Sequence, residues 1–142
     1  MNHRAFRPLN PTVSLVLLAM MTALTTVATV VIAIPFPWGG YLNFGDVLVM
    51  LSGLLLGPLG GFLAGGVGSA MGDVMLSYYP FVPITFVTKG MEGMLVGYFA
   101  LKARGLNRLT KWDLLGIILG ATAMLTGYFV GEVILLGPEA AV

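Results

Sequence analysis

Long apolar runs, separated by clusters of proline and glycine, make up most of the chain. The runs and their breaks predict five helices, at residues 12–34, 46–56, 58–76, 82–101 and 112–136. The breaks fall at PFPWGG, GPLGG and SYYPFVP, where proline removes a backbone donor and glycine favours turns. Because about 20 apolar residues are enough to cross a bilayer, the pattern predicts a bundle of transmembrane helices.

The first apolar run has the outline of a signal peptide, because Arg4 and Arg7 precede it. However, the run covers residues 13–34, whereas the apolar part of a signal peptide spans about 7–15 residues. We therefore interpret it as a retained first helix.

Composition agrees with a membrane location. The chain has 142 residues, of which 58% are hydrophobic and 9% charged, and its mean hydropathy is +0.96. Soluble domains contain about 25% charged residues. The length leaves room for five spans and short loops, so residues 1–142 should form one domain. A net charge of +1 argues against a nucleic-acid surface. The predicted fold class is an all-α integral membrane protein, a bundle of about five transmembrane helices.

The basic residues predict the orientation of the chain in the membrane. Six of the seven lysines and arginines lie in two clusters: Arg4 and Arg7, and Lys102, Arg104, Arg108 and Lys111. The positive-inside rule places both clusters in the cytoplasm. Four predicted helices separate the clusters, and an even number returns the chain to the same side. The sequence thus predicts a multi-pass protein with a cytoplasmic N-terminus.

Lys89 is the remaining basic residue, and it lies inside a predicted helix. Counted from residue 82 at 1.5 Å per residue, it is about 10 Å deep. Glu92 follows at i+3 on the same helical face. Asp46, Asp73 and Glu132 fall in the same outer half of the predicted bundle. One interpretation is a structural Lys–Glu pair, and the aspartates alone would also suit helix caps. Because charges from four helices meet in one leaflet, we favour a polar pocket open to the outside.

Small residues at four-residue spacing predict close helix packing. Glycines repeat in this way within residues 57–65, which ordinary bundle packing explains. The first helix instead has Ala19 and Ala23 at i and i+4, with Thr22 and Thr26 beside them. Such a stripe is a docking face, and the pattern leaves open whether it serves the bundle interior or a separate membrane subunit.

The sequence argues against catalysis. It contains no Walker A motif, so the chain should not hydrolyse ATP itself. The single histidine, His3, cannot form a histidine-based metal site, and no base is placed to activate a serine or threonine. We expect neither an enzyme nor a bound metal or cofactor.

Three segments carry a resemblance to a known family. They are YLNFGDVLVMLSGLLLGPLGGFLAGGVGSAMGDVM, PITFVTKGMEGMLVGYF and GYFVGEVILLGPEAA, at residues 41–75, 83–99 and 127–141. With the runs LGPxxG, GxGSAxGD and KGxEG in this order, the chain from about residue 12 to its end resembles the S components of energy-coupling factor (ECF) transporters. The closest group is the riboflavin-transporter-like one.

The resemblance implies a substrate-binding subunit in the bacterial cell membrane. Such subunits capture a water-soluble vitamin or precursor from outside, here a riboflavin-like, pyridoxine-like or pyrimidine compound. They dock onto a transmembrane coupling subunit that is carried by two ATPase subunits. The AxxxA motif of the family matches Ala19 and Ala23, which favours a partner for this face. The expected substrate-binding residues are Asn43, Asp73, Lys89, Glu92, Tyr128 and Glu132.

The sequence departs from the family in its helix count. The family fold has six helices, and this chain ends where the sixth should begin, so we expect a domain that is incomplete at the C-terminus and a pocket that lacks one wall. Two other functions are a secondary carrier with Glu92 and Glu132 as an ion or proton relay, and a purely structural bundle. The sequence shows no inverted repeat with matching broken helices, which counts against the carrier.

Overall fold

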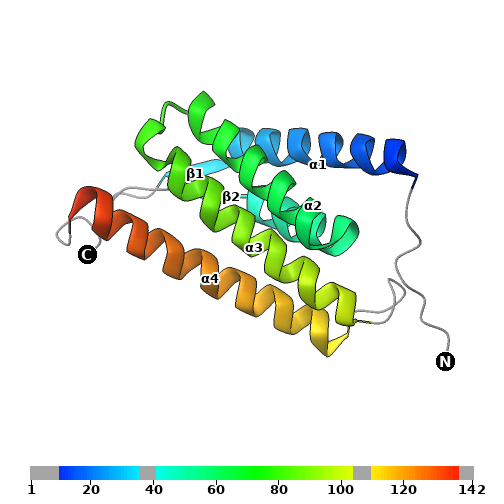
Figure 1. Ribbon diagram of the computed structural model, residues 1–142. Coiled ribbons are helices and arrows are strands. Elements are labelled where there is room, and N and C mark those ends of the chain that lie inside the picture. The colour runs from blue at the N-terminus through cyan, green and yellow to red at the C-terminus, as the bar shows by residue number, and fades with distance from the viewer. Residues whose placement is uncertain (1–9, 36–40, 104–109, 138–142) are drawn as a thin grey trace.

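The computed structural model describes residues 10–35, 41–103 and 110–137 (Figure 1). Its elements are α1 (Pro11–Val31), β1 (Ala33–Pro35), β2 (Tyr41–Asn43), α2 (Gly45–Met75), the short 3-10 helix η1 (Tyr79–Phe81), α3 (Val82–Lys102) and α4 (Lys111–Leu136). The helices are those that the apolar runs predict, with ends that differ by less than a turn. The all-α membrane bundle is confirmed, with one small antiparallel ribbon, β1–β2, between α1 and α2.

Local sequence explains where two of the helices begin. Asn10 accepts a hydrogen bond from the Thr12 backbone N–H at 3.4 Å, and Pro11 occupies the first turn, where no backbone donor is needed. At the start of α4, Thr110 and Asp113 form a capping box in which each side chain accepts a hydrogen bond from the other residue's backbone. These caps fix α1 and α4 without help from other helices.

A sharp kink divides α2 into two halves. Gly57 has φ +76° and ψ −170°, values that suit glycine, and Pro58 starts the second half. The two halves of α2 fold back on each other. This is seen at Gly61, where an added Cβ atom would lie 2.7 Å from the Gly53 Cα. The break predicted at GPLGG is therefore confirmed. The two helices predicted around it, at residues 46–56 and 58–76, are the two halves of α2, which share one label although Gly57 between them is not helical.

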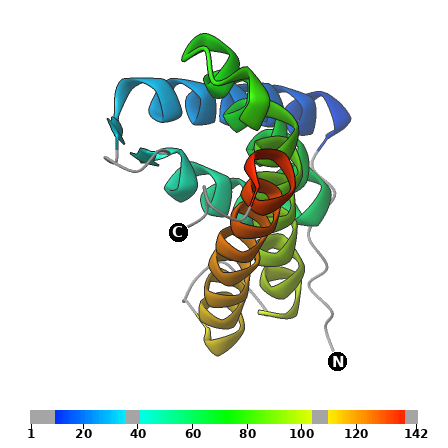
Figure 2. The same cartoon turned by 90° about the vertical axis from the view of Figure 1, so that its left-hand side faces the viewer.

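The helices pack in chain order, with α3 between α2 and α4 (Figures 1 and 2). The approach of α2 to α3 is closest at two glycines, since a Cβ atom on Gly93 would lie 2.7 Å from the Gly61 carbonyl carbon. Two backbones can come this near only where neither residue has a side chain. The small-residue spacing thus reflects helix packing, as the sequence predicted.

α1 packs on the second half of α2 through threonines. Thr25 and Thr29 are fully buried, and the Thr26 hydroxyl donates a hydrogen bond to the Gly68 carbonyl oxygen at 2.9 Å. In a membrane, where lipid gives little drive for helices to associate, such small residues and interhelical hydrogen bonds hold helices together. The threonine face of α1 is therefore the face that the bundle uses.

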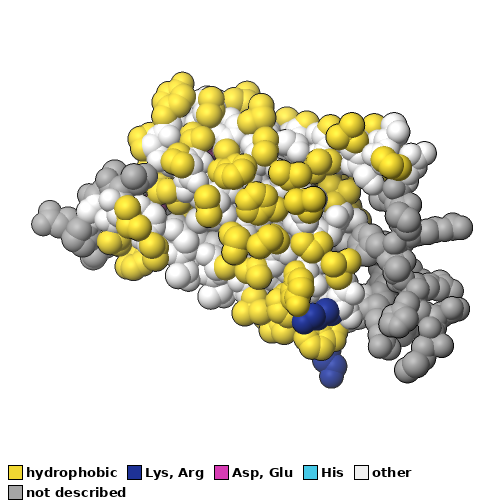
Figure 3. Space-filling view, in the orientation of Figure 1, with side chains coloured by type: hydrophobic (Ala, Val, Ile, Leu, Met, Phe, Trp, Pro, Cys, Tyr) yellow, Lys and Arg dark blue, Asp and Glu magenta, His cyan; other side chains and the backbone are white. Residues whose placement is uncertain are grey.

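Within the described ranges, three helices are long and apolar enough to cross a membrane: α1, α2 and residues Lys111–Ile134 of α4. Large apolar side chains cover the surface of the described helices (Figure 3), with Leu59 and Ile134 72% and 75% exposed. In contrast, polar and charged residues of α3 such as Lys89 and Glu92 lie in the interior. This inverted distribution is that of an integral membrane protein.

Candidate functional site

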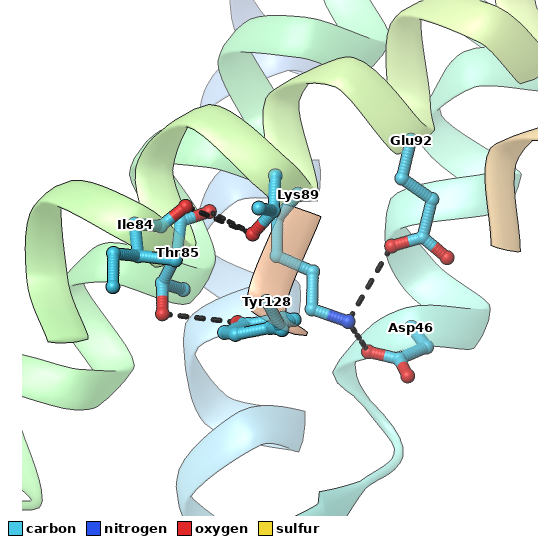
Figure 4. A network of polar contacts seen from close by, with 7 residues as sticks. Asp46, Ile84, Thr85, Lys89, Glu92 and Tyr128 are labelled. Carbon is cyan, nitrogen blue, oxygen red and sulfur yellow. Dashed lines mark hydrogen bonds and ion pairs between the residues drawn. The ribbon is translucent and has the colours of Figure 1, made fainter. Parts of the chain in front are cut away.

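Lys89 is the centre of a buried polar network between α2, α3 and α4 (Figure 4). The residue is only 3% exposed. Its ammonium forms an ion pair with Asp46, in the first turn of α2, and lies 3.4 Å from Glu92 Oε2, one turn along α3. A lysine is tolerated at such a depth because two carboxylates replace the water that it has lost.

α4 contributes Tyr128 to the same network. The Lys89 ammonium lies 5.7 Å from the centre of the Tyr128 ring, a distance that suits a cation–π contact. The Tyr128 hydroxyl donates a hydrogen bond to Thr85 Oγ1 on α3 at 2.9 Å. Asp73, from the second half of α2 and 2% exposed, interacts electrostatically with Tyr128. The network therefore joins both halves of α2 to α3 and α4.

The structure brings together four of the six residues expected to bind substrate, namely Asp73, Lys89, Glu92 and Tyr128. Glu132 is half-buried on α4, and no contact among the described residues joins it to Lys89. Asn43 lies in β2, where its backbone pairs with Ala33, and its side chain falls outside the described part.

Asp46 and Thr85 are members of the network that the expected set of substrate-binding residues does not include. The sequence placed Asp46 in the outer half with Lys89 but also favoured a helix cap, because it starts a helix. Its carboxylate does occupy the first turn of α2, where the helix dipole favours negative charge, and it also pairs with Lys89. Thr85 could have been found from its position one turn before Lys89 on the same face of α3.

Acidic groups outnumber basic ones in the network. Two carboxylates, those of Asp46 and Glu92, contact a single ammonium, that of Lys89. Glu92 is fully buried, and its second carboxylate oxygen, Oε1, has no hydrogen-bond partner among the described residues. A buried acceptor without a donor is costly, so this oxygen is an unsatisfied point of the network. No three acidic or histidine side chains of the described residues are grouped to hold a metal ion.

A second feature lies on the outer face of α1. Ala19 and Ala23 are exposed and line an open apolar groove of about 550 Å³, to which Met71 of α2 contributes one edge. Of the threonines that α2 covers, Thr25 and Thr29 lie outside this groove, whereas Thr26 also lines it. Among the described residues, the two alanines are thus left uncovered by the other helices.

The fold and these features define a multi-pass membrane protein with a buried, multi-helix polar site. Its residues 10–141 match the model of the family "ECF-type riboflavin transporter, S component". The chain belongs to this family, as the resemblance indicated. Membership makes it a substrate-binding subunit of an ECF transporter, and the family is a class of transporter subunits instead of enzymes.

One curated protein is similar to the chain over most of its length. The chain is 45% identical over 118 residues to a protein of Pyrococcus woesei described as an uncharacterized protein in the gap 3' region. The match covers 82% of this chain and 76% of that protein. No solved structure is significantly similar to the chain.

Proposed function

We propose that the chain captures a water-soluble vitamin or vitamin precursor on the outer side of the membrane and delivers it for ATP-driven uptake by partner subunits. The observation that supports this most is the network around Lys89. Charged side chains of different helices are buried together there, although an apolar core would have a lower free-energy cost in a membrane. Family membership makes a riboflavin-like molecule the first compound to test.

Expression in the membrane of a host cell, followed by purification in mild detergent and mass spectrometry, tests this function. A vitamin should leave the protein on denaturation in a ratio near one to one. The purified protein should also quench the fluorescence of added riboflavin or bind another vitamin from a panel that includes pyridoxine and thiamine. Protein that holds no vitamin and binds none of the panel would refute the proposal. Uptake that follows the membrane potential without ATP would favour the secondary carrier instead.

The proposed orientation puts the N-terminus and the α3–α4 loop in the cytoplasm. At the end of α3, the Lys102 ammonium lies 4.7 Å from the centre of the Tyr98 ring and 5.7 Å from that of Trp112. Basic and aromatic side chains of this kind are typical of a membrane interface.

The chain lacks cysteine, so single cysteines that are introduced by mutation can report the topology without background labelling. In intact cells an impermeant maleimide should label Ser77→Cys and not Lys111→Cys, and the reverse pattern would invert the orientation.

The alanine groove is the proposed contact with the transmembrane coupling subunit, which two ATPase subunits carry. Support comes from the exposure of Ala19 and Ala23, which the bundle itself leaves uncovered. Small residues at this spacing allow another helix to approach closely. The substrate site lies on other helices, so docking and substrate binding should be separable by mutation.

We expect Ala23→Leu to fill the groove and to lower recovery of the coupling subunit in co-purification by at least about tenfold, a loss of about 1.4 kcal/mol in binding free energy. Vitamin content should stay unchanged. The matched control is Val16→Leu, which enlarges an exposed apolar side chain of α1 outside the groove and should leave the complex intact. Equal recovery with both variants would remove the groove as the docking face.

A further inference from the structure

We infer that the site selects its ligand by charge: it takes an uncharged or cationic molecule that donates hydrogen bonds to Glu92, and it rejects anionic molecules such as phosphate esters. The inference rests on the proposed function, since it names the class of molecule that the same site would bind. It also changes the role of Lys89 from a ligand contact to a positioning residue.

Two of the hydrogen-bond donors of Lys89 are already used within the protein. An ammonium has three N–H groups. One side of this ammonium is occupied by Asp46, another by Glu92 Oε2 at 3.4 Å, and the Tyr128 ring lies 5.7 Å away (Figure 4). An anionic ligand at this ammonium would compete with Asp46 and Glu92, and displacement of either would leave a carboxylate without its cation.

The groups around the Lys89 ammonium carry more negative than positive charge. Two carboxyl groups, those of Asp46 and Glu92, share the ammonium of one lysine, and a third, that of Asp73, interacts electrostatically with Tyr128. Among the described residues no other lysine or arginine makes an ion pair in this part of the bundle. In a low-dielectric interior a further negative charge would be repelled strongly, while a neutral or positive ligand would not.

Glu92 supplies the hydrogen-bond acceptor for a ligand. Glu92 is 0% exposed, and its Oε1 atom has no hydrogen-bond partner among the described residues. An N–H or O–H donor on a ligand would satisfy this oxygen, and a hydrogen bond to a charged acceptor is stronger than one between neutral groups. Lys89 holds the other oxygen of the same carboxylate, so it fixes the direction in which Oε1 points. The ligand class is therefore a small molecule with N–H or O–H donors and no negative charge.

The experiment compares each vitamin with its own phosphate ester on the purified full chain. The pairs are riboflavin and riboflavin 5'-phosphate, pyridoxine and its phosphate, and thiamine and its monophosphate, measured by fluorescence or calorimetry. For the vitamin that binds, we expect the ester to bind at least about a hundredfold more weakly, because like charges at close range cost several kcal/mol.

A variant of Glu92 tests whether this residue causes the discrimination between a vitamin and its phosphate ester. Glu92→Gln keeps the shape of the side chain and removes its charge. It should lower the affinity for the vitamin about tenfold and reduce the difference in affinity between the vitamin and its ester. Lys102→Gln, at the exposed end of the same helix, serves as the control and should change neither. Equal affinity for a vitamin and its ester, or an anionic molecule that co-purifies, would overturn the inference alone. Failure of every vitamin to bind would instead refute the proposed function on which it rests.

Discussion

Lys89→Met should remove both vitamin binding and much of the stability of the bundle. The substitution keeps an unbranched side chain that is one atom shorter, but it leaves the part-buried Asp46 and the fully buried Glu92 without a cation. Loss of one partner from a buried ion pair costs about 3–5 kcal/mol, which is a large part of the stability of a protein of this size. The measurements are thermal unfolding in detergent and the vitamin content of the purified protein.

Lys102→Met is the matched control, because it makes the same change on the same helix. Lys102 lies at the end of α3 with its ammonium over aromatic rings, and an exposed contact of that type is worth about 0.5–1 kcal/mol. The control should therefore unfold close to the wild type and keep its vitamin. Wild-type behaviour of Lys89→Met would show that the network contributes neither to the fold nor to binding.

A triple variant separates the structural role of the network from its role in binding. Lys89→Met combined with Asp46→Asn and Glu92→Gln removes every charge of the ion pairs, and neutral replacements of buried ion pairs often restore stability. We expect this protein to fold and to lack vitamin. If it folded and still bound vitamin with wild-type affinity, the charges would be a structural device only, which is the simpler interpretation of the Lys–Glu spacing.

Much of the site could be predicted because charge in an apolar helix is a strong signal. Lys89 and Glu92 are three residues apart in a run that is otherwise built for lipid, and only a polar interior accommodates both. The membership of Asp46 was harder to predict, because an aspartate at a helix start has a sufficient local explanation. Sequence shows the depth of a residue along its helix well, but the direction in which a side chain points across the bundle depends on how the helices are rotated.

The same limit explains what the sequence left open in α1 and α2. Both alanines and threonines on α1 are small enough for close packing, so composition alone could not say which face the bundle would cover. The structure buries the threonines, whose hydroxyls can bond to a neighbouring backbone, as Thr26 does with Gly68. In α2, the Gly57–Pro58 step predicted a break. That the two halves return antiparallel follows from contacts between Gly53 and Gly61, which no local pattern reveals.

Gly93→Ala is expected to give the second large effect, since it acts on the contact that sets the spacing of α2 and α3. The added methyl group would lie 2.7 Å from the Gly61 carbonyl carbon, well inside van der Waals contact. The opposing atoms are backbone and cannot rotate aside, so the two helices must separate. Overpacking of this kind costs about 1–3 kcal/mol, and the higher helix propensity of alanine offsets about 1 kcal/mol of it, so we expect a net loss of about 2 kcal/mol in unfolding free energy.

The consequence for function follows from the location of the ion pairs. Lys89 is on α3 and Asp46 on α2, so separation of these helices should also weaken vitamin binding. Gly131→Ala is the control: it is again glycine to alanine within a helix, but the nearest atoms to the new methyl group belong to the side chain of Ile84, which can adjust its rotamer. Thermal unfolding and vitamin affinity of the two variants provide the comparison. If Gly93→Ala were as stable as Gly131→Ala and bound vitamin equally well, the contact between Gly61 and Gly93 would not determine the geometry of the site, and the ion pairs alone would have to position α2 against α3.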